Sequence, residues 1–239
     1  MKFAVVSDIH GNLEAFQTTL DYLHQHHISK IICLGDLVGY GPNPNECVEL
    51  AQKHCTVTVM GNHDHAVLGL TDIDYFNEYA RAAVLWTRRS LHRYLKGYLE
   101  NLPMTYEEND FLFVHSSPVD PSEWYYIFSE AEARQNFKAV PNRVIFIGHS
   151  HVPVVFSLEK GRLFEQHLRL DIENDRYIIN VGSVGQPRDG DPRSSFTIVD
   201  DQSKTVEYVR LEYPVEKTHQ KILDAGLPYF LARRILVGQ

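Results

Sequence analysis

The sequence contains few cysteines, and their arrangement excludes several kinds of site. Only 3 of the 239 residues are cysteines. Cys33, Cys47 and Cys55 are odd in number and lack the Cys-x-x-Cys spacing of thiolate metal sites and redox motifs. A disulfide framework is therefore not expected. We interpret these residues as reduced thiols of a cytoplasmic protein.

Long apolar runs and an excess of positive charge are also missing. No apolar stretch approaches the ~20 residues that cross a bilayer. One lysine and a very short apolar run precede Asp8, which is not the pattern of a signal peptide. Lys and Arg number 23 against 31 Asp and Glu, so the formal net charge is −8. This charge argues against a membrane-surface partner and against strong nucleic-acid binding.

The remaining composition is that of a globular α/β protein. No linker, repeat or low-complexity tract interrupts the chain, so we expect one domain over residues 1–239. Apolar spacing predicts a helix over 13–23 with Asn12 as its N-cap, and another over 44–53. A helical segment over about 74–102 is expected to cover the site, and helices are expected over 214–239. The expected strands lie at 3–6, 30–34, 56–60, 111–114, 144–147, 154–158, 163–168, 177–180, 195–199 and 206–210.

Polar side chains follow several of these strands directly. The apolar run Phe3–Val6 leads into Asp8 and His10, which alternation along a strand would point the same way. A strand, helix, strand order implies parallel strands, so Asp36 should reach the same sheet edge. Later strand-like runs end in the same kind of residue, namely Asn62, His63, His115, His149 and His151.

Carboxylate, amide and imidazole groups without thiolate suit borderline divalent metals. Manganese, iron, cobalt, nickel and zinc all accept such ligands. The residues are too many for one tetrahedral zinc site with an open position. Two metal ions that share a carboxylate would use all of them, and we favour manganese as the ion.

The motifs together resemble the calcineurin-like metallophosphoesterase family. They are Asp-x-His (8–10), Gly-Asp (35–36), Gly-Asn-His-Asp (61–64), a lone His after a strand (115) and Gly-His-x-His (148–151). The short chain and the Gly-Ser-Val-Gly-Gln-Pro-Arg turn (182–188) resemble the small prokaryotic phosphodiesterases and phosphatases. The resemblance implies a four-layer α/β/β/α sandwich with a dinuclear metal site at the C-terminal ends of strands.

The resemblance also implies a role for each motif residue. One metal would be bound by Asp8, His10 and His151. The second would be bound by three other residues, and Asp36 would bridge the two ions. Those three residues are Asn62, His115 and His149.

The same resemblance leaves His63 free of metal, beside the leaving group. A metal-bridging hydroxide would attack the phosphorus, and His63 would protonate the leaving alkoxide as a general acid. Asp64 would orient the His63 ring, or it would serve only as a local turn or cap. Asn62 and His63 would also contact the substrate. Tyr40 and Arg188 are further candidates for substrate binding, although Tyr40 could be a packing residue and Arg188 could pair with the acids at 189 and 191.

We therefore expect a phosphoesterase that hydrolyses small phosphodiester or nucleotide-type substrates. A phosphomonoesterase is the nearest alternative, and the sequence does not separate the two. A nuclease is a second alternative, which the acidic charge disfavours. A scaffold that has lost the chemistry is a third, which the complete motif set disfavours. The sequence leaves the oligomeric state open.

Overall fold

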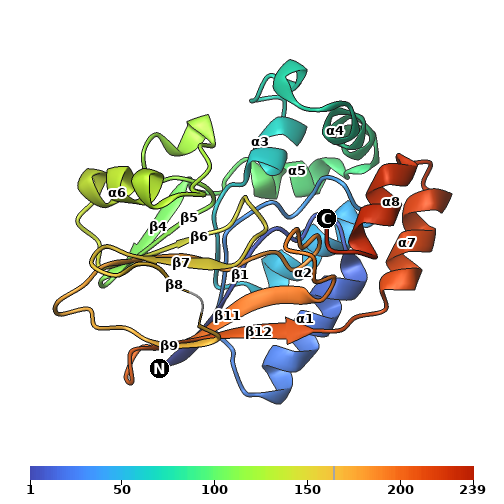
Figure 1. Ribbon diagram of the computed structural model, residues 1–239. Coiled ribbons are helices and arrows are strands. Elements are labelled where there is room, and N and C mark those ends of the chain that lie inside the picture. Colours follow the sequence, from blue (N-terminus) through green and yellow to red (C-terminus); the bar gives the residue numbers. More distant parts are fainter. Residues whose placement is uncertain (164) are drawn as a thin grey trace.

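The computed structural model describes residues 1–163 and 165–239. They form two six-stranded sheets, with helices on the outer face of each (Figure 1). The first sheet has the strand order β3-β2-β1-β11-β12-β9, and the second has the order β4-β5-β6-β10-β7-β8. The α/β/β/α arrangement implied by the family resemblance is confirmed.

The strands and helices follow one another along the chain with short connections. The strands are β1 (Lys2–Val6), β2 (Ile31–Cys33), β3 (Val57–Thr58), β4 (Thr105–Glu108), β5 (Phe111–Val114), β6 (Val144–Ile147), β7 (Val154–Ser157), β8 (Gly161–Leu163), β9 (His167–Arg169), β10 (Tyr177–Asn180), β11 (Ser194–Asp200) and β12 (Thr205–Leu211). The helices are α1 (Leu13–Gln25), α2 (Pro44–His54), α3 (Asn62–Val67), α4 (Glu78–Ser90), α5 (Arg93–Leu99), α6 (Glu130–Ala139), α7 (Val215–Asp224) and α8 (Tyr229–Ile235), with 3-10 turns at Ile73–Tyr75 and Pro121–Glu123.

Strands β1, β2, β5 and β6 are apolar at nearly every position because both of their faces are buried. In β1, Phe3 and Val5 pack between the two sheets, whereas Ala4 and Val6 pack on the side of α1 and α2. Strands β5 and β6 alternate in the same way between the inter-sheet core and a core under α6. The polar candidate site residues therefore lie in the segments that follow strands and not within the strands.

Several local predictions are confirmed. Strands β1, β2 and β3 pair in parallel, so the loops after them leave the same edge of the sheet. Asn12 caps α1 and accepts a hydrogen bond from the Ala15 amide at 3.1 Å. The structure also shows a capping box of Ser129 and Glu132 at the start of α6.

Other predictions need correction. The sequence did not predict a helix after β3, but residues 62–67 form the short helix α3. The expected strand over 163–168 contains residue 164, which lies outside the described residues, and its other residues fall in β8, β9 and the segment between them. The single-domain organisation stays a prediction.

The expected covering segment forms two helices, α4 and α5. Helix α4 packs with α7, α8 and the Tyr40 side chain in a separate apolar cluster. Within residues 1–163 and 165–239, the structure contains no helix long and apolar enough to cross a membrane.

Candidate metal centre

The proposed metal ligands lie together where loops from both sheets meet. The first sheet contributes the loops after β1 and β2, together with the start of α3, which follows β3. The second sheet contributes the loops after β5 and β6. The side chains that these loops bring together are all buried: Asp8, His10, Asp36, Asn62, His115, His149 and His151.

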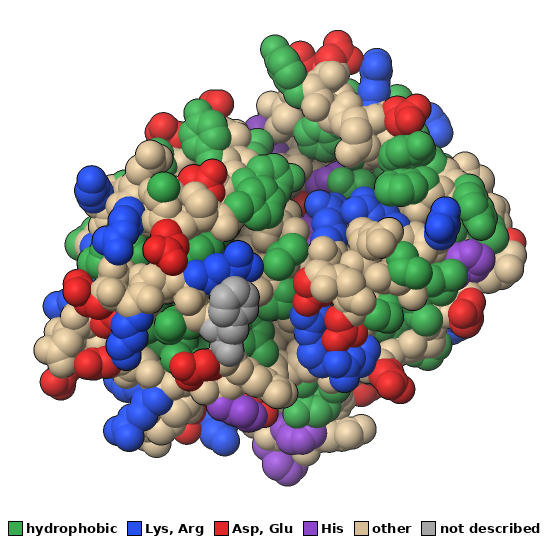
Figure 2. Space-filling view, viewed as in Figure 1, with side chains coloured by type: hydrophobic (Ala, Val, Ile, Leu, Met, Phe, Trp, Pro, Cys, Tyr) green, Lys and Arg blue, Asp and Glu red, His purple; other side chains and the backbone are tan. Residues whose placement is uncertain are grey.

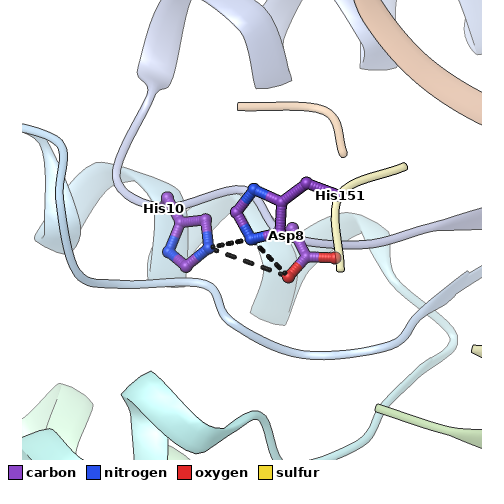
Figure 3. Close-up of side chains that lie close together, drawn as sticks. All are labelled: Asp8, His10 and His151. Carbon is purple, nitrogen blue, oxygen red and sulfur yellow. Dashed lines mark hydrogen bonds and ion pairs between the residues drawn. The ribbon is translucent and has the colours of Figure 1, made fainter. Parts of the chain in front are cut away.

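Asp8, His10 and His151 form one compact group (Figure 3). The Oδ1 atom of Asp8 lies 3.2 Å from His151 Nε2 and 3.7 Å from His10 Nε2. The two histidine Nε2 atoms are only 3.0 Å apart. The other Asp8 oxygen accepts a hydrogen bond from the His149 amide at 3.0 Å, which fixes the carboxylate.

Asp36 lies between this group and a second one. Its Oδ2 atom is 3.5 Å from His10 Nε2 and 3.4 Å from His115 Nε2. The Nε2 atom of His115 is also 3.1 Å from the Asn62 side-chain oxygen. The ring of His149 lies beside that of His115, with 5.0 Å between their centres. One carboxylate thus faces residues of both expected ligand sets.

The loop backbone reaches this arrangement through the left-handed region. The alternation expected for Asp8 and His10 is wrong, because β1 ends at Val6 and both residues lie in the loop beyond it. Such conformations cost energy for residues other than glycine and cluster at functional sites. Five of the seven candidate ligands have φ between 50° and 65°, namely Asp8, His10, Asp36, His149 and His151.

Glycines beside the ligands let these loops approach one another. At Gly35, φ is +92°, and a Cβ atom would lie 2.5 Å from the Gly61 backbone nitrogen. At Gly148, a Cβ atom would lie 2.0 Å from the Ser7 hydroxyl and 2.5 Å from the Asp8 carboxylate. At both motif positions, any residue larger than glycine would therefore clash with a neighbouring segment of the site.

The hydrogen bonds of three histidines orient their free nitrogens toward the cluster. The Nδ1–H groups of His10, His115 and His151 donate to the carbonyls of Val38, Leu34 and Gln186, at 3.0, 2.8 and 2.6 Å. A carbonyl can only accept, so each Nδ1 carries a proton and each neutral ring has its lone pair on Nε2. This is the usual way in which proteins orient metal-binding histidines.

The same geometry fits a cation at the cluster. With Nδ1 protonated, neutral His10 and His151 point two lone pairs at each other across 3.0 Å. Within residues 1–163 and 165–239, Asp8 Oδ1 and His149 Nε2 are buried and have no hydrogen-bond partner. Buried polar atoms without partners are uncommon in folded proteins and point to a missing ligand. Divalent ions coordinated by these atoms would satisfy all of them.

The charges in the cluster interact strongly. Burial opposes the charge of Asp36, but His115 and His63 outweigh it, so the pKa of this carboxyl lies well below its usual value. Burial likewise opposes a charge on His115, yet Asp36 raises the pKa of this imidazole to about 9. Burial together with His115 lowers the pKa of His149 to about 3, and burial together with Arg188 lowers that of His151 to about 3. His149 and His151 are therefore neutral, as metal ligands must be.

His63 lies at the edge of the cluster, on α3. Its ring centre is 4.9 Å from that of His10 and 4.4 Å from that of Tyr40. Its Nδ1 atom is buried and has no hydrogen-bond partner among the residues that the structure describes. It also falls in a candidate ligand group with His10 and Asp36. Its expected freedom from metal stays a prediction.

The Asp64 carboxylate acts as a local cap. It accepts hydrogen bonds from the Val38 and Gly61 amides, both at 3.2 Å, and so holds the N-terminal end of α3. The expected orienting contact with the His63 ring is therefore replaced by backbone contacts. Of the two interpretations that the sequence allowed, the structure shows the cap.

Arg188 faces the site and not the acids that follow it in the chain. Those acids pair elsewhere, since Asp191 binds Arg193 at 2.7 Å and Asp189 binds Arg210. The guanidinium carbon of Arg188 lies 5.6 Å from the centre of the Tyr40 ring. The alternative in which Arg188 pairs with Asp189 or Asp191 is not seen.

A cavity of about 800 Å³ opens beside the cluster. His63, His149 and Asn62 lie in its wall, together with residues from the covering segment and from the 118–126 loop. Aromatic rings are prominent among them: Tyr40, Tyr75, Phe76, Trp124 and Tyr126. The Tyr126 ring stacks on His149 with 4.0 Å between centres. Aromatic and polar side chains thus share the wall of this cavity.

Sequence reasoning missed Arg234 of α8. Its guanidinium carbon lies 5.9 Å from the centre of the Tyr40 ring. The residue sits in an ordinary amphipathic helix, and no spacing relates it to the motif loops. The packing of α8 against α4 and Tyr40 alone places it there.

Comparison with known proteins gives the class and the family. The family model described as the calcineurin-like phosphoesterase superfamily domain matches residues 1–204. The protein is accordingly a phosphoric ester hydrolase. More particularly, the chain belongs to the calcineurin-like phosphoesterase superfamily, as its motifs predicted.

Individual relatives extend over most of the chain. An uncharacterized protein of Methanocaldococcus jannaschii is 42% identical and covers 99% of this chain and 98% of its own. The crystal structure of a metallophosphoesterase from Sphaerobacter thermophilus is 39% identical, covers 100% of this chain and 99% of its own, and superposes with a TM-score of 0.90. Phosphodiesterase YfcE of Escherichia coli is 23% identical over 81% of this chain and 85% of its own.

Proposed function

We propose that the protein hydrolyses small phosphodiester or nucleotide-type substrates at a centre of two divalent metal ions. The position of Asp36 is the observation that carries this proposal. A single Asp36 oxygen lies 3.5 Å from His10 Nε2 and 3.4 Å from His115 Nε2. A carboxylate placed between two groups of ligands is suited to bridge two ions.

The ligands divide between the two ions as the motifs suggest. Asp8, His10 and His151 would hold one ion, and their contacts of 3.0–3.7 Å support this grouping. Asn62, His115 and His149 would hold the other. The two ions would supply positive charge to the phosphoryl oxygens and lower the pKa of a coordinated water toward ~7. The oxygen and nitrogen donors accept several metals. Manganese, which we favour from the sequence, is the first ion to test.

His63 is proposed as the general acid. It lies at the boundary between the metal ligands and the cavity, so its ring can reach a leaving oxygen there. Asn62, also in the cavity wall, would contact the same phosphoryl group. Proton transfer from a positioned histidine contributes typically ~10²–10⁴-fold to the rate. Asp64 supports His63 indirectly, by holding the start of α3.

The cavity wall favours a substrate with a flat, apolar portion. Trp124 and Tyr126 line it from one side, and Phe76 and the highly exposed Tyr75 line it from the other. Aromatic rings of this kind stack on bases and on nitrophenyl groups. A relative named as a phosphodiesterase, YfcE, supports diester chemistry. Tyr40 and Arg188 would contact the substrate beside its reacting phosphate. Location in the cytoplasm stays a prediction.

Hydrolysis by metal-stripped protein tests this function directly. Bis-p-nitrophenyl phosphate and p-nitrophenyl phosphate would be supplied with manganese, nickel, cobalt, zinc or magnesium in turn. We expect metal-dependent release of nitrophenol that is faster from the diester. Faster release from the monoester would assign the protein as a phosphomonoesterase. No release with any metal, from folded protein that binds two ions, would contradict the proposal.

A further inference from the structure

Two arginines from distant segments meet over one tyrosine beside the metal centre. Arg188 belongs to the 182–191 loop, and Arg234 belongs to α8. Their guanidinium carbons lie 5.6 Å and 5.9 Å from the centre of the Tyr40 ring. That ring is in turn 4.7 Å from the His10 ring and 4.4 Å from the His63 ring. Two positive charges are thus held one aromatic ring away from the proposed ligands.

No Asp or Glu side chain forms an ion pair with either guanidinium among residues 1–163 and 165–239. Arg188 donates from Nη2 to the Gln186 side chain at 2.9 Å, but its buried Nε atom has no hydrogen-bond partner in that part of the chain. Arg234 donates from Nε to the backbone oxygen of Gln239. Several donors of the pair therefore remain available, and the Nε atom of Arg188 needs an acceptor.

The two like charges also act on each other and on the site. Burial together with the charge of Arg188 lowers the pKa of Arg234 to about 10. Burial is the main cause of the lowered pKa of His151, and the charge of Arg188 adds to it. Two cations held near each other with no acidic side chain paired to them repel one another, and a bound anion would relieve this repulsion.

We propose that Arg188 and Arg234 form a subsite for a second anionic group of the substrate. The preferred substrates of the metal centre would then be small phosphoesters that carry a further phosphate or carboxylate close to the reacting phosphorus. This inference rests on the proposed function, because it assumes that the reacting phosphate lies at the ligand cluster. The planar guanidinium presents paired N–H donors that match the oxygens of phosphate and carboxylate groups.

The subsite combines the family domain with a segment outside it. The family model matches residues 1–204, whereas α7 and α8 lie beyond that range. The apolar cluster that joins α4, α7 and α8 contains Tyr40 and so fixes the position of Arg234. In Figure 2, Lys or Arg side chains lie beside histidine side chains at the hollow between the two halves of this face. Substrate selection would therefore depend on these C-terminal helices.

A series of phosphonates tests the subsite. Methylphosphonate carries one anionic group, and phosphonoacetate, 3-phosphonopropionate and 4-phosphonobutyrate add a carboxylate at increasing distance. Their affinities for the metal-loaded protein would be measured by calorimetry at fixed free metal. Inhibition constants against bis-p-nitrophenyl phosphate would be measured in parallel. We expect at least one carboxylated member to bind about 10-fold tighter than methylphosphonate, which corresponds to ~1.4 kcal/mol.

Three variants test whether Arg188 and Arg234 cause the tighter binding of the carboxylated phosphonate. Arg234→Gln and Arg188→Gln should each remove most of the advantage of the carboxylated phosphonate. Arg233→Gln is the matched control, because this exposed arginine precedes Arg234 on the same helix and should retain the advantage. Equal affinity of the wild-type protein for all four phosphonates, or an advantage that survives Arg234→Gln, would overturn the subsite. Failure of the proposed function is a different result, since wild-type protein would then release no nitrophenol, while calorimetry would still report on the subsite.

Discussion

The Asp36→Asn variant is the most direct test of a two-ion centre. Asp36 Oδ2 faces His10 and His115 at 3.5 and 3.4 Å, and Oδ1 accepts the His63 amide at 2.8 Å. An asparagine removes the negative charge and replaces one oxygen by an NH₂ group. If the NH₂ group faces the histidines, no ligand oxygen remains there. If the NH₂ group faces the His63 amide, both groups are hydrogen-bond donors and the hydrogen bond at this position is lost.

We expect each ion to bind about 100-fold more weakly to Asp36→Asn. This loss is ~2.8 kcal/mol per ion, at ~1.4 kcal/mol per tenfold change in affinity. It is comparable to the ~1.5–3 kcal/mol of a hydrogen bond to a charged group. Calorimetric titration of metal-free protein with manganese, with elemental analysis of the dialysed protein, would measure both sites.

The Asp8→Asn variant is the matched comparison. Asp8 Oδ1 lies near His10 and His151, at 3.7 and 3.2 Å, so its loss should weaken one ion and spare most of the affinity for the other. A titration of Asp36→Asn that retains one site at wild-type affinity would assign Asp36 to a single ion. The bridging role, and with it the main support for two ions, would then be refuted.

Three further variants test the general acid, the apolar core and the ion pairs of the buried Glu14 carboxylate. His63→Ala should keep its metal content but lose about 10²–10⁴-fold in kcat toward bis-p-nitrophenyl phosphate; loss of metal would show that His63 is a ligand. Phe113→Ala should lower the free energy of unfolding in urea by about 3–5 kcal/mol, because the ring is fully buried and stacks on Phe146 at 5.3 Å; a change below ~1 kcal/mol would contradict a close-packed inter-sheet core. Glu14→Gln tests pH dependence: burial opposes the Glu14 charge, but Lys221 and Lys217 outweigh it and hold its pKa below the ordinary value. Wild-type protein should therefore be more stable than Glu14→Gln at neutral pH. This difference in stability should vanish as the pH falls through the lowered pKa of Glu14. A stability difference that does not change with pH would show that the ion pairs of Glu14 do not cause it.

The sequence predicted the site better than it predicted the local structure around it. Parallel pairing of β1 with β2 carries the ends of both strands to one edge, so the proximity of Asp8 and Asp36 follows from strand order alone. Alternation in β1 and β5 likewise follows from apolar runs that are buried on both faces. These features depend on neighbours in the chain and on general rules of topology.

The features that were missed depend on contacts between distant segments. Asp8 and His10 point to one place because their backbone adopts positive φ, which strand alternation does not describe. The sequence did not decide between the two roles of Asp64, whose carboxylate accepts hydrogen bonds from the Gly61 and Val38 amides. Arg234 reaches Tyr40 only through helix packing. None of these contacts has a local sequence signal.

The division of ligands between the sheets has a consequence for stability. Asp8, His10 and Asp36 follow strands of the first sheet, whereas His115 and His151 follow strands of the second. The sheets otherwise meet mainly through apolar side chains. An ion bound by His10 and His151 thus links the two sheets at the edge where the cavity opens. Because such a site exists only in the folded protein, its binding energy adds to the stability of the folded state. The left-handed loops, the neutral histidines and the buried atoms without partners are costs of the metal-free fold that bound ions would offset.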